Sequence, residues 1–237
     1  MKFGTSDQDY LARRRAFSAE AGPREIWSVM DQWPLYAGIG NLARSMAVAD
    51  LFRSTLGVPG HIAEFGCWRG SNLMFLAKLL QIYDPHSMKM VHGFDSFQGL
   101  TAFVKEDGVG AEKAGAYRGS LDELTRIIDL YQMQDSVTLH VGLIEDTLPP
   151  LLRAHEALSF SFVYCDTDLY QSTATILREM HPRLMKGGLF VFDEWNWDAY
   201  PGEGKAVNEF IEEHSARYAV EHVPHARQPN LVLRKLT

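Results

Sequence analysis

The sequence predicts an α/β fold, with a doubly wound, mostly parallel seven-stranded sheet and an N-terminal helical cap. From about Gly60 onward, short apolar runs alternate with longer helical patterns. These patterns span about 10 to 15 residues, a length typical of right-handed crossovers between parallel strands. Glycines and prolines fall between the periodic segments, as expected of one compact domain. Residues 1–59 do not follow the alternation.

Short apolar segments rich in aliphatic and aromatic residues predict the strands. The first five are joined by helical patterns, and two closing strands follow at the C-terminal end. The expected strands are 62–65, 90–94, 137–141, 160–165, 189–192, 218–223 and 231–234.

Helix start and stop signals define the segments between the strands. Ser71 is a suitable N-cap for a helix that stops before Asp84-Pro85, and Ser120 with Glu123 forms a capping box. The expected helices after Gly60 are 71–83, 121–131, 149–153, 172–181 and one around 206–211.

The N-terminal segment and one long loop differ from this alternation. Residues 26–30 and 42–52 have the pattern of cap helices, whose aromatic residues are expected to pack on the sheet. Residues 99–119 are rich in glycine and charge and contain few large apolar residues beyond Phe103. Such a segment is typical of a mobile loop over the ligand edge of the sheet.

Length and composition limit the function classes. The 237 residues, 46% hydrophobic and 22% charged, fit one large domain, 60–237, with the appendage 1–59. A net charge of −7 argues against binding to nucleic acid. Cys67 and Cys165 have no metal-ligand spacing, and the first residues contain no apolar signal region. We therefore expect a cytoplasmic protein without a membrane or nucleic-acid partner.

The first two strands are each followed by residues suited to a nucleoside-containing cofactor. Gly66 and Gly70 flank the first turn, where a following helix N-terminus favours a negative group. Their spacing is not that of a dinucleotide fingerprint. Asp95 ends the second strand, where an acid can accept both ribose hydroxyls. The alternatives are an ordinary tight turn at the glycines and a turn or cap role for Asp95.

Four carboxylates follow two strands that are expected to be neighbours. Asp166 and Asp168 follow the fourth strand, and Asp193 and Glu194 follow the fifth. They would repel one another unless a cation, a proton or a basic group offsets them. Mg²⁺ prefers such oxygen ligands. The alternative is that Asp166 or Asp193 caps the next helix and that Glu194 is solvated.

Taken together, six motifs resemble the macrocin O-methyltransferase family, which methylates sugar hydroxyls of natural products with S-adenosylmethionine. The resemblance covers about Pro59 to Phe210 and implies a Rossmann-like class I methyltransferase fold. The motifs are, in order, AEFGCWRGSNL, GFDSFQGL, EDTLPPLL, YCDTDLYQST, HPRLMKGG and VFDEW.

The resemblance also implies a role for each matching residue. Asp95 would hold the ribose of S-adenosylmethionine with Ser96 nearby, and Gly142 and Leu143 would lie by the adenine. The residues expected at the methionine end are Glu64, Gly66, Gly70 and Ser71.

For the reaction itself, the resemblance implies a metal and a base. Asp166, Asp193 and Glu194 match the family's Mg²⁺ ligands, and Asp168 matches its general base. Glu194 replaces the family's usual second Asp, which puts the metal site in doubt, and Trp195-Asn-Trp197 is bulkier than the usual residues and predicts a different acceptor pocket.

Other interpretations remain open at this point. One of the nine histidines is an alternative base, although none lies in the four ligand motifs. The acceptor could instead be a catechol-like or other small molecule, and a non-catalytic cofactor-binding partner protein is a further alternative. The apolar cap would also suit a homo-oligomer interface.

Overall fold

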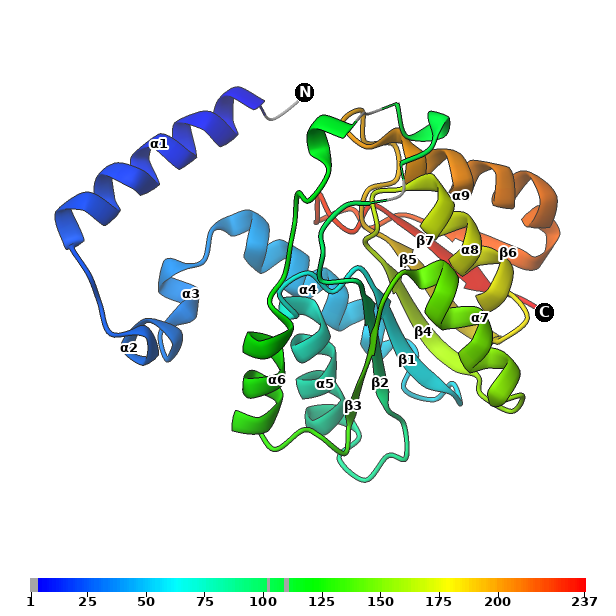
Figure 1. Ribbon diagram of the computed structural model, residues 1–237. Helices are drawn as coiled ribbons and strands as arrows, with labels where there is room; N and C mark the ends of the chain where they lie inside the picture. Colours follow the sequence, from blue (N-terminus) through cyan, green and yellow to red (C-terminus); the bar gives the residue numbers. More distant parts are fainter. Residues whose placement is uncertain (1–3, 102, 109–110) are drawn as a thin grey trace. The chain divides into compact units, whose positions relative to one another are not determined.

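The predicted fold class is confirmed. Within the described residues 4–101, 103–108 and 111–237, the computed structural model contains one seven-stranded sheet in the order β3-β2-β1-β4-β5-β7-β6 (Figure 1). Neighbouring strands from β3 to β5 are parallel, and β7 is antiparallel to both β5 and β6. The strands are β1 (His61–Phe65), β2 (Val91–Asp95), β3 (Val137–Val141), β4 (Phe160–Cys165), β5 (Leu184–Phe192), β6 (Tyr218–Glu221) and β7 (Leu231–Lys235).

Helices cover both faces of the sheet (Figure 1). On one face, α4, α5 and α6 pack with strand residues such as Ile62 and Phe162 in one buried cluster. On the other face, α7, α8 and α9 pack with the alternate residues Ala63 and Val163. Side chains of successive strand residues point to opposite faces, so both faces need an apolar cover.

The helices that cover the sheet occur in the predicted order, but their first and last residues differ from the predicted ones. Three 3₁₀ turns are also present among the described residues: η1 (Lys105–Asp107), η2 (Ala111–Lys113) and η3 (Ser215–Arg217). The sheet-covering helices are α4 (Ile39–Arg53), α5 (Ser71–Tyr83), α6 (Leu121–Leu130), α7 (Ile144–Ala154), α8 (Tyr170–Met180) and α9 (Pro201–His214).

Two helix starts show why the ends differ. Gly70, at φ +81°, is the N-cap of α5, so Ser71 is the first helical residue and not the cap. Helix α7 begins at Ile144 instead of Pro149, because an acidic first turn and the buried Ile144 and Leu148 outweigh the N–H groups lost at its two prolines. The predicted cap of α6 is confirmed, since Ser120 Oγ accepts from the Glu123 N–H at 3.2 Å.

Strand β5 starts at Leu184, five residues before the predicted start at Leu189. Its first half pairs irregularly with β4, because the register shifts between Phe160 and Phe162. The glycines Gly187 and Gly188 in this half resemble a turn signal in the sequence, which explains the shorter prediction.

The chain divides into two compact units, 1–42 and 43–237. The first holds α1 (Gly4–Ala21), α2 (Ile26–Met30) and α3 (Trp33–Tyr36), of which α1 and α3 were not predicted. Residues of α4 from Ala43 onward belong to the second unit, because Ala47, Val48 and Phe52 are buried in its core. The first unit is therefore shorter than the predicted cap, 1–59. None of the helices in the described part of the chain has both the length and the apolar character of a membrane span.

Candidate functional site

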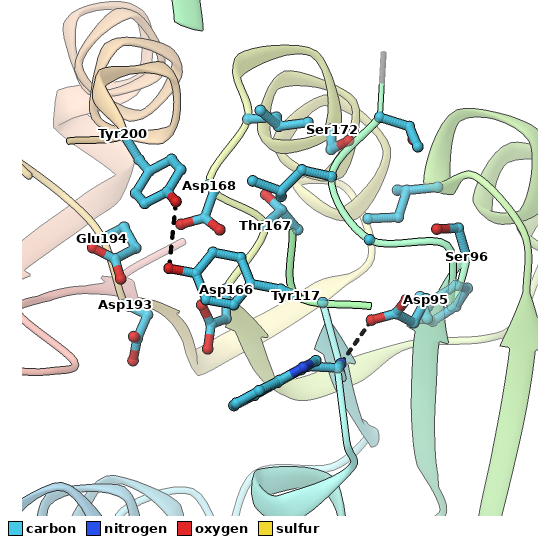
Figure 2. Close-up of a pocket in the computed structure, with 18 of the residues that line it drawn as sticks. Asp95, Ser96, Tyr117, Asp166, Thr167, Asp168, Ser172, Asp193, Glu194 and Tyr200 are labelled. Atoms are coloured by element: carbon cyan, nitrogen blue, oxygen red, sulfur yellow. Dashed lines mark hydrogen bonds between the residues drawn. The ribbon is translucent and has the colours of Figure 1, made fainter. Parts of the chain in front are cut away.

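A cavity of about 360 Å³ lies at the carboxyl ends of the five parallel strands (Figure 2). Each of these strands supplies at least one lining residue at or just after its end, such as Gly66, Asp95, Gly142, Asp166 and Asp193. In open α/β sheets, ligands bind at this edge. The cavity volume is in the range of small-molecule sites.

Five of the eight residues predicted to bind the cofactor line this cavity: Gly66, Asp95, Ser96, Gly142 and Leu143. The Asp95 carboxylate accepts the N–H of Trp68 at 2.7 Å and that of Phe97 at 2.6 Å. It thereby joins the loops that follow β1 and β2. Burial raises the pKa of Asp95, and these backbone donors partly offset the rise.

The two glycines of the first turn are needed for the fold itself. Gly66 has φ +85°, and a Cβ there would lie 1.8 Å from the carbonyl oxygen of Asp166. Gly70 packs against Leu124, which a Cβ would meet at 2.2 Å. The turn after β1 and the turn after β4 can therefore approach each other only with glycine at position 66.

Glu64 and Ser71 are placed differently from the lining residues. Glu64 is 1% exposed within β1, and its Oε1 accepts from Asn72 Nδ2 at 3.0 Å. Its other oxygen, Oε2, is buried and has no hydrogen-bond partner among the described residues. Burial raises the pKa of Glu64 well above its ordinary value. Ser71 is exposed at the start of α5.

The acidic residues form a group whose membership differs from the predicted metal set. Asp166, Asp168 and Glu194 each offer an oxygen, and these oxygens all lie within 4.8 Å of one another. Asp193 lies outside this group and accepts from the Tyr164 hydroxyl and from Arg44. Figure 2 shows the acidic side chains on one side of the cavity and Asp95 with Ser96 on the other.

Mutual repulsion and burial shift the titration of this group. Burial and repulsion from Asp166 and Asp193 raise the pKa of Asp168 to about 7. Burial and repulsion from Asp168 and Asp166 raise the pKa of Glu194 to about 8. Asp168 and Glu194 are therefore only partly ionised near neutral pH.

Glu203, which the sequence analysis missed, connects the two acidic loops. It is fully buried in α9, and its Oε1 accepts the Glu194 N–H at 2.8 Å. Its Oε2 faces the Thr167 N–H at 3.4 Å, between Asp166 and Asp168. Burial raises the pKa of Glu203 well above its ordinary value. No local sequence signal identifies it, because it lies on a helix outside the strand-end motifs.

Aromatic side chains form another part of the wall. Trp68, Tyr117, Trp197 and Tyr200 line the cavity, and the Tyr200 hydroxyl donates to that of Tyr117 at 3.3 Å (Figure 2). Of the bulky pair noted in the sequence, only Trp197 is among the described lining residues, because Trp195 packs against the core.

The segment 99–119 borders the cavity as predicted, with Gly99, Leu100, Thr101 and Tyr117 among the lining residues. It is fixed by Asp107, which is fully buried and accepts the N–H groups of Val104 and Tyr170, each at 2.7 Å. Residues 102, 109 and 110 of this segment lie outside the described residues.

Histidine does not occur among the described residues that line the cavity. His92 and His140 share a hydrogen bond of 3.0 Å elsewhere in the sheet, and burial lowers the pKa of His92 to about 3. His181 pairs with the Tyr218 hydroxyl at 2.9 Å. The titratable side chains among the described lining residues are therefore Arg44, acidic residues and tyrosines.

Part of the chain is similar in sequence to known O-methyltransferases. Mycinamicin III 3''-O-methyltransferase of Micromonospora griseorubida is 29% identical over 169 residues, which are 67% of this chain and 63% of that protein. Demethyldecarbamoylnovobiocin O-methyltransferase of Streptomyces niveus is 31% identical over 146 residues, 58% of this chain and 53% of that protein. The matches thus span less than two thirds of these relatives' own length.

Solved structures share the fold. The calicheamicin methyltransferase CalS11 superposes with a TM-score of 0.83 at 24% identity, covering 97% of this chain and 92% of that chain. The O-methyltransferase NovP gives a TM-score of 0.69 at 24% identity, covering 82% and 80%. The sequence model of the macrocin-O-methyltransferase (TylF) family matches residues 31–226. Since this is most of the chain, the protein belongs to the macrocin-O-methyltransferase (TylF) family.

Proposed function

We propose that this protein transfers the methyl group of S-adenosylmethionine to a hydroxyl of a sugar or glycosylated natural product. The observation that carries the proposal is the buried Asp168 carboxylate, which lies on the wall of a cavity that Asp95 also lines. The similar mycinamicin and novobiocin enzymes, named as O-methyltransferases, support the reaction class. The small-molecule acceptor, not nucleic acid, is the expected partner.

In this proposal, one part of the cavity holds the cofactor. Asp95 accepts the ribose hydroxyls near Ser96, and Gly142 and Leu143 border the adenine. The turn at Gly66 borders the methionine end, with Glu64, Gly70 and Ser71 shaping the same turn. The unpartnered Glu64 Oε2 fits a role toward the cofactor's ammonium group, directly or through water.

The reaction is an in-line displacement. The acceptor oxygen forms a bond to the methyl carbon as the carbon–sulfur bond breaks, which leaves S-adenosylhomocysteine as a neutral thioether. The hydroxyl proton passes to the Asp168 carboxylate. A base with a pKa of about 7 suits this transfer at neutral pH.

The acidic group fits a divalent cation, since it gathers carboxylate oxygens within 4.8 Å and leaves the buried Glu194 Oε2 without a partner among the described residues. Asp166 and Glu194 belong both to the predicted metal ligands and to this group of carboxylates, and we assign them to Mg²⁺. When bound, the ion would act as a Lewis acid that lowers the pKa of the acceptor hydroxyl.

The aromatic side chains and the segment 99–119 shape the acceptor pocket in this proposal. Trp197, Tyr117 and Tyr200 offer flat apolar faces suited to a sugar ring or an aromatic aglycone. The segment 99–119 acts as a lid that excludes water while the acceptor is held.

The test is production of S-adenosylhomocysteine with a panel of glycosides, free sugars and catechols. We expect turnover with glycosides, and D168N should lower it about 10²- to 10⁴-fold while cofactor binding measured by calorimetry stays nearly unchanged. D135N is the control, because Asp135 is exposed and is not among the residues that line the cavity. Turnover with catechols but not with glycosides would show that the acceptor is a catechol and not a sugar. Tight cofactor binding without any transfer would indicate a non-catalytic binding protein.

A further inference from the structure

A guanidinium from outside the strand-end motifs enters the acidic group. Arg44 lies on α4, and its Nη2 is 2.8 Å from Asp166 Oδ2 and 3.0 Å from Asp193 Oδ1. The same nitrogen lies 3.4 Å from the Tyr164 hydroxyl oxygen, and that hydroxyl donates to Asp193. Asp166 and Asp193 are thus bridged by a cation that belongs to the chain.

The bridge joins one buried carboxylate and one partly exposed carboxylate. The Asp193 side chain is 1% exposed, against 27% for Asp166 and 34% for Arg44. Burial alone would lower the pKa of Arg44, but the neighbouring Tyr164, Asp193 and Asp166 raise it. Arg44 therefore keeps its charge, and removing it would leave the buried Asp193 carboxylate with the Tyr164 hydroxyl but without its cationic partner.

Among the described residues, no Lys or Arg forms an ion pair with Asp168 or Glu194, and the charge of Lys113 only partly offsets the burial that raises the pKa of Asp168. Asp168 and Glu194, with one oxygen of Asp166, form the group within 4.8 Å that excludes Asp193. Gln228 Nε2 donates to Glu194 Oε1 at 2.7 Å, which supplies a hydrogen bond but no charge. The two halves of the acidic cluster therefore differ in how their charge is balanced.

We propose that Arg44 is a positioning residue that keeps Asp193 out of the metal site, so that a divalent cation binds at Asp166 and Glu194 beside Asp168 and competes with the guanidinium for Asp166. This inference rests on one part of the proposed function, the binding of a divalent cation, and not on the methyl transfer. It differs from the predicted ligand set, in which Asp193 binds the ion directly.

The test measures the affinity of the full chain for Mn²⁺ in the absence of cofactor and acceptor. Electron paramagnetic resonance reports the concentration of free Mn²⁺ during the titration. We expect D193N to bind Mn²⁺ with the affinity of wild type, because Asp193 forms an ion pair with Arg44 and does not bind the ion. R44M should bind of the order of tenfold more tightly, since it releases two carboxylates. R53M, on the same helix with its exposed Asp50 pair at 3.6 Å, is the matched control.

The opposite pattern overturns the inference: D193N loses tenfold or more in affinity, or R44M binds no better than wild type. Binding by neither wild type nor R44M also overturns it. Thermal melting checks that the variants fold. If R44M unfolds without metal, its recovery in Mg²⁺ supports competition, and D193N still decides the ligand set. The Mn²⁺ measurement contains no acceptor, so its result does not depend on methyl transfer. Conversely, a failure of the Mn²⁺ prediction would not contradict the proposed methyl transfer.

Discussion

At the scale of single residues, Asp168 combines an uncommon backbone conformation with a carboxylate in a crowded acidic site. Its φ is +61°, in the left-handed region, which Asp and Asn tolerate better than other non-glycine residues. Its side chain is 8% exposed and lies near Asp166 and Asp193. D168N is consequently the substitution of choice, because Asn keeps the shape and the backbone conformation and removes only the charge.

We expect the charge of Asp168 to weaken folding as the pH rises. Its pKa is about 7 in the folded chain against an ordinary value of 3.8, so between these values the folded state holds a proton that the unfolded state has lost. Stability falls through this window, and the penalty is complete above about pH 7. D168N should therefore gain stability over wild type with rising pH, up to about 4 kcal/mol. Chemical unfolding without divalent metal at pH 4, 6 and 8 measures this; a difference independent of pH contradicts it.

A second residue-scale prediction concerns Gly66. A Cβ at φ +85° and 1.8 Å from the Asp166 carbonyl oxygen must displace the turn after β4, so G66A should lower the free energy of unfolding by roughly 3 kcal/mol. G57A is the matched control, because a Cβ at Gly57 meets nothing within 4 Å. Urea unfolding of both variants compares them, and equal stability would show that the turn relaxes freely.

At the scale of elements, buried carboxylates hold the loops around the cavity together. Glu203 on α9 joins the turns after β4 and β5, and Asp107 joins the segment 99–119 to the start of α8. Gly202 allows this approach, since a Cβ there would lie 2.1 Å from Asp107 Oδ1. The segment 99–119 is thus bonded to the start of α8 and lies against α9, and Glu203 of α9 holds the acidic loops.

We expect D107N to loosen the segment 99–119 without unfolding the sheet. An amide supplies a single acceptor oxygen for the two N–H groups of Val104 and Tyr170, so one charge-assisted hydrogen bond is lost, about 1.5 to 3 kcal/mol locally. Hydrogen exchange should quicken in peptides covering 103–108 and the start of α8. D122N, exposed on α6, serves as the control. Faster exchange throughout the sheet would instead mean global destabilisation.

At the scale of the whole molecule, the unit 1–42 exposes large apolar side chains. Leu35 is 72% exposed and Ile39 87%, with Ile26, Trp27 and Met30 also exposed. Large apolar side chains exposed in this number within one short segment suit an interface. This supports the expectation of a homo-oligomer formed through the N-terminal helices.

The corresponding prediction is that the chain, with a mass of 26.8 kDa, sediments as an oligomer. The double variant L35E/I39E should sediment as a monomer with an unchanged melting temperature, because neither side chain is buried. Analytical ultracentrifugation at several concentrations measures this. A monomeric wild type would refute the interface.

The sequence by itself determined the sheet, its five parallel strands and the edge where the site lies, because strand periodicity and strand-end polarity are local patterns. It identified Asp95, Asp166 and Asp168 as residues of that edge. Only the tertiary structure decided that Arg44 bridges Asp166 and Asp193 and that Glu203 joins the acidic loops. These contacts join residues far apart in the chain, or on a helix and a loop, and no local pattern encodes them. Charge balance in a buried site depends on which groups meet in space.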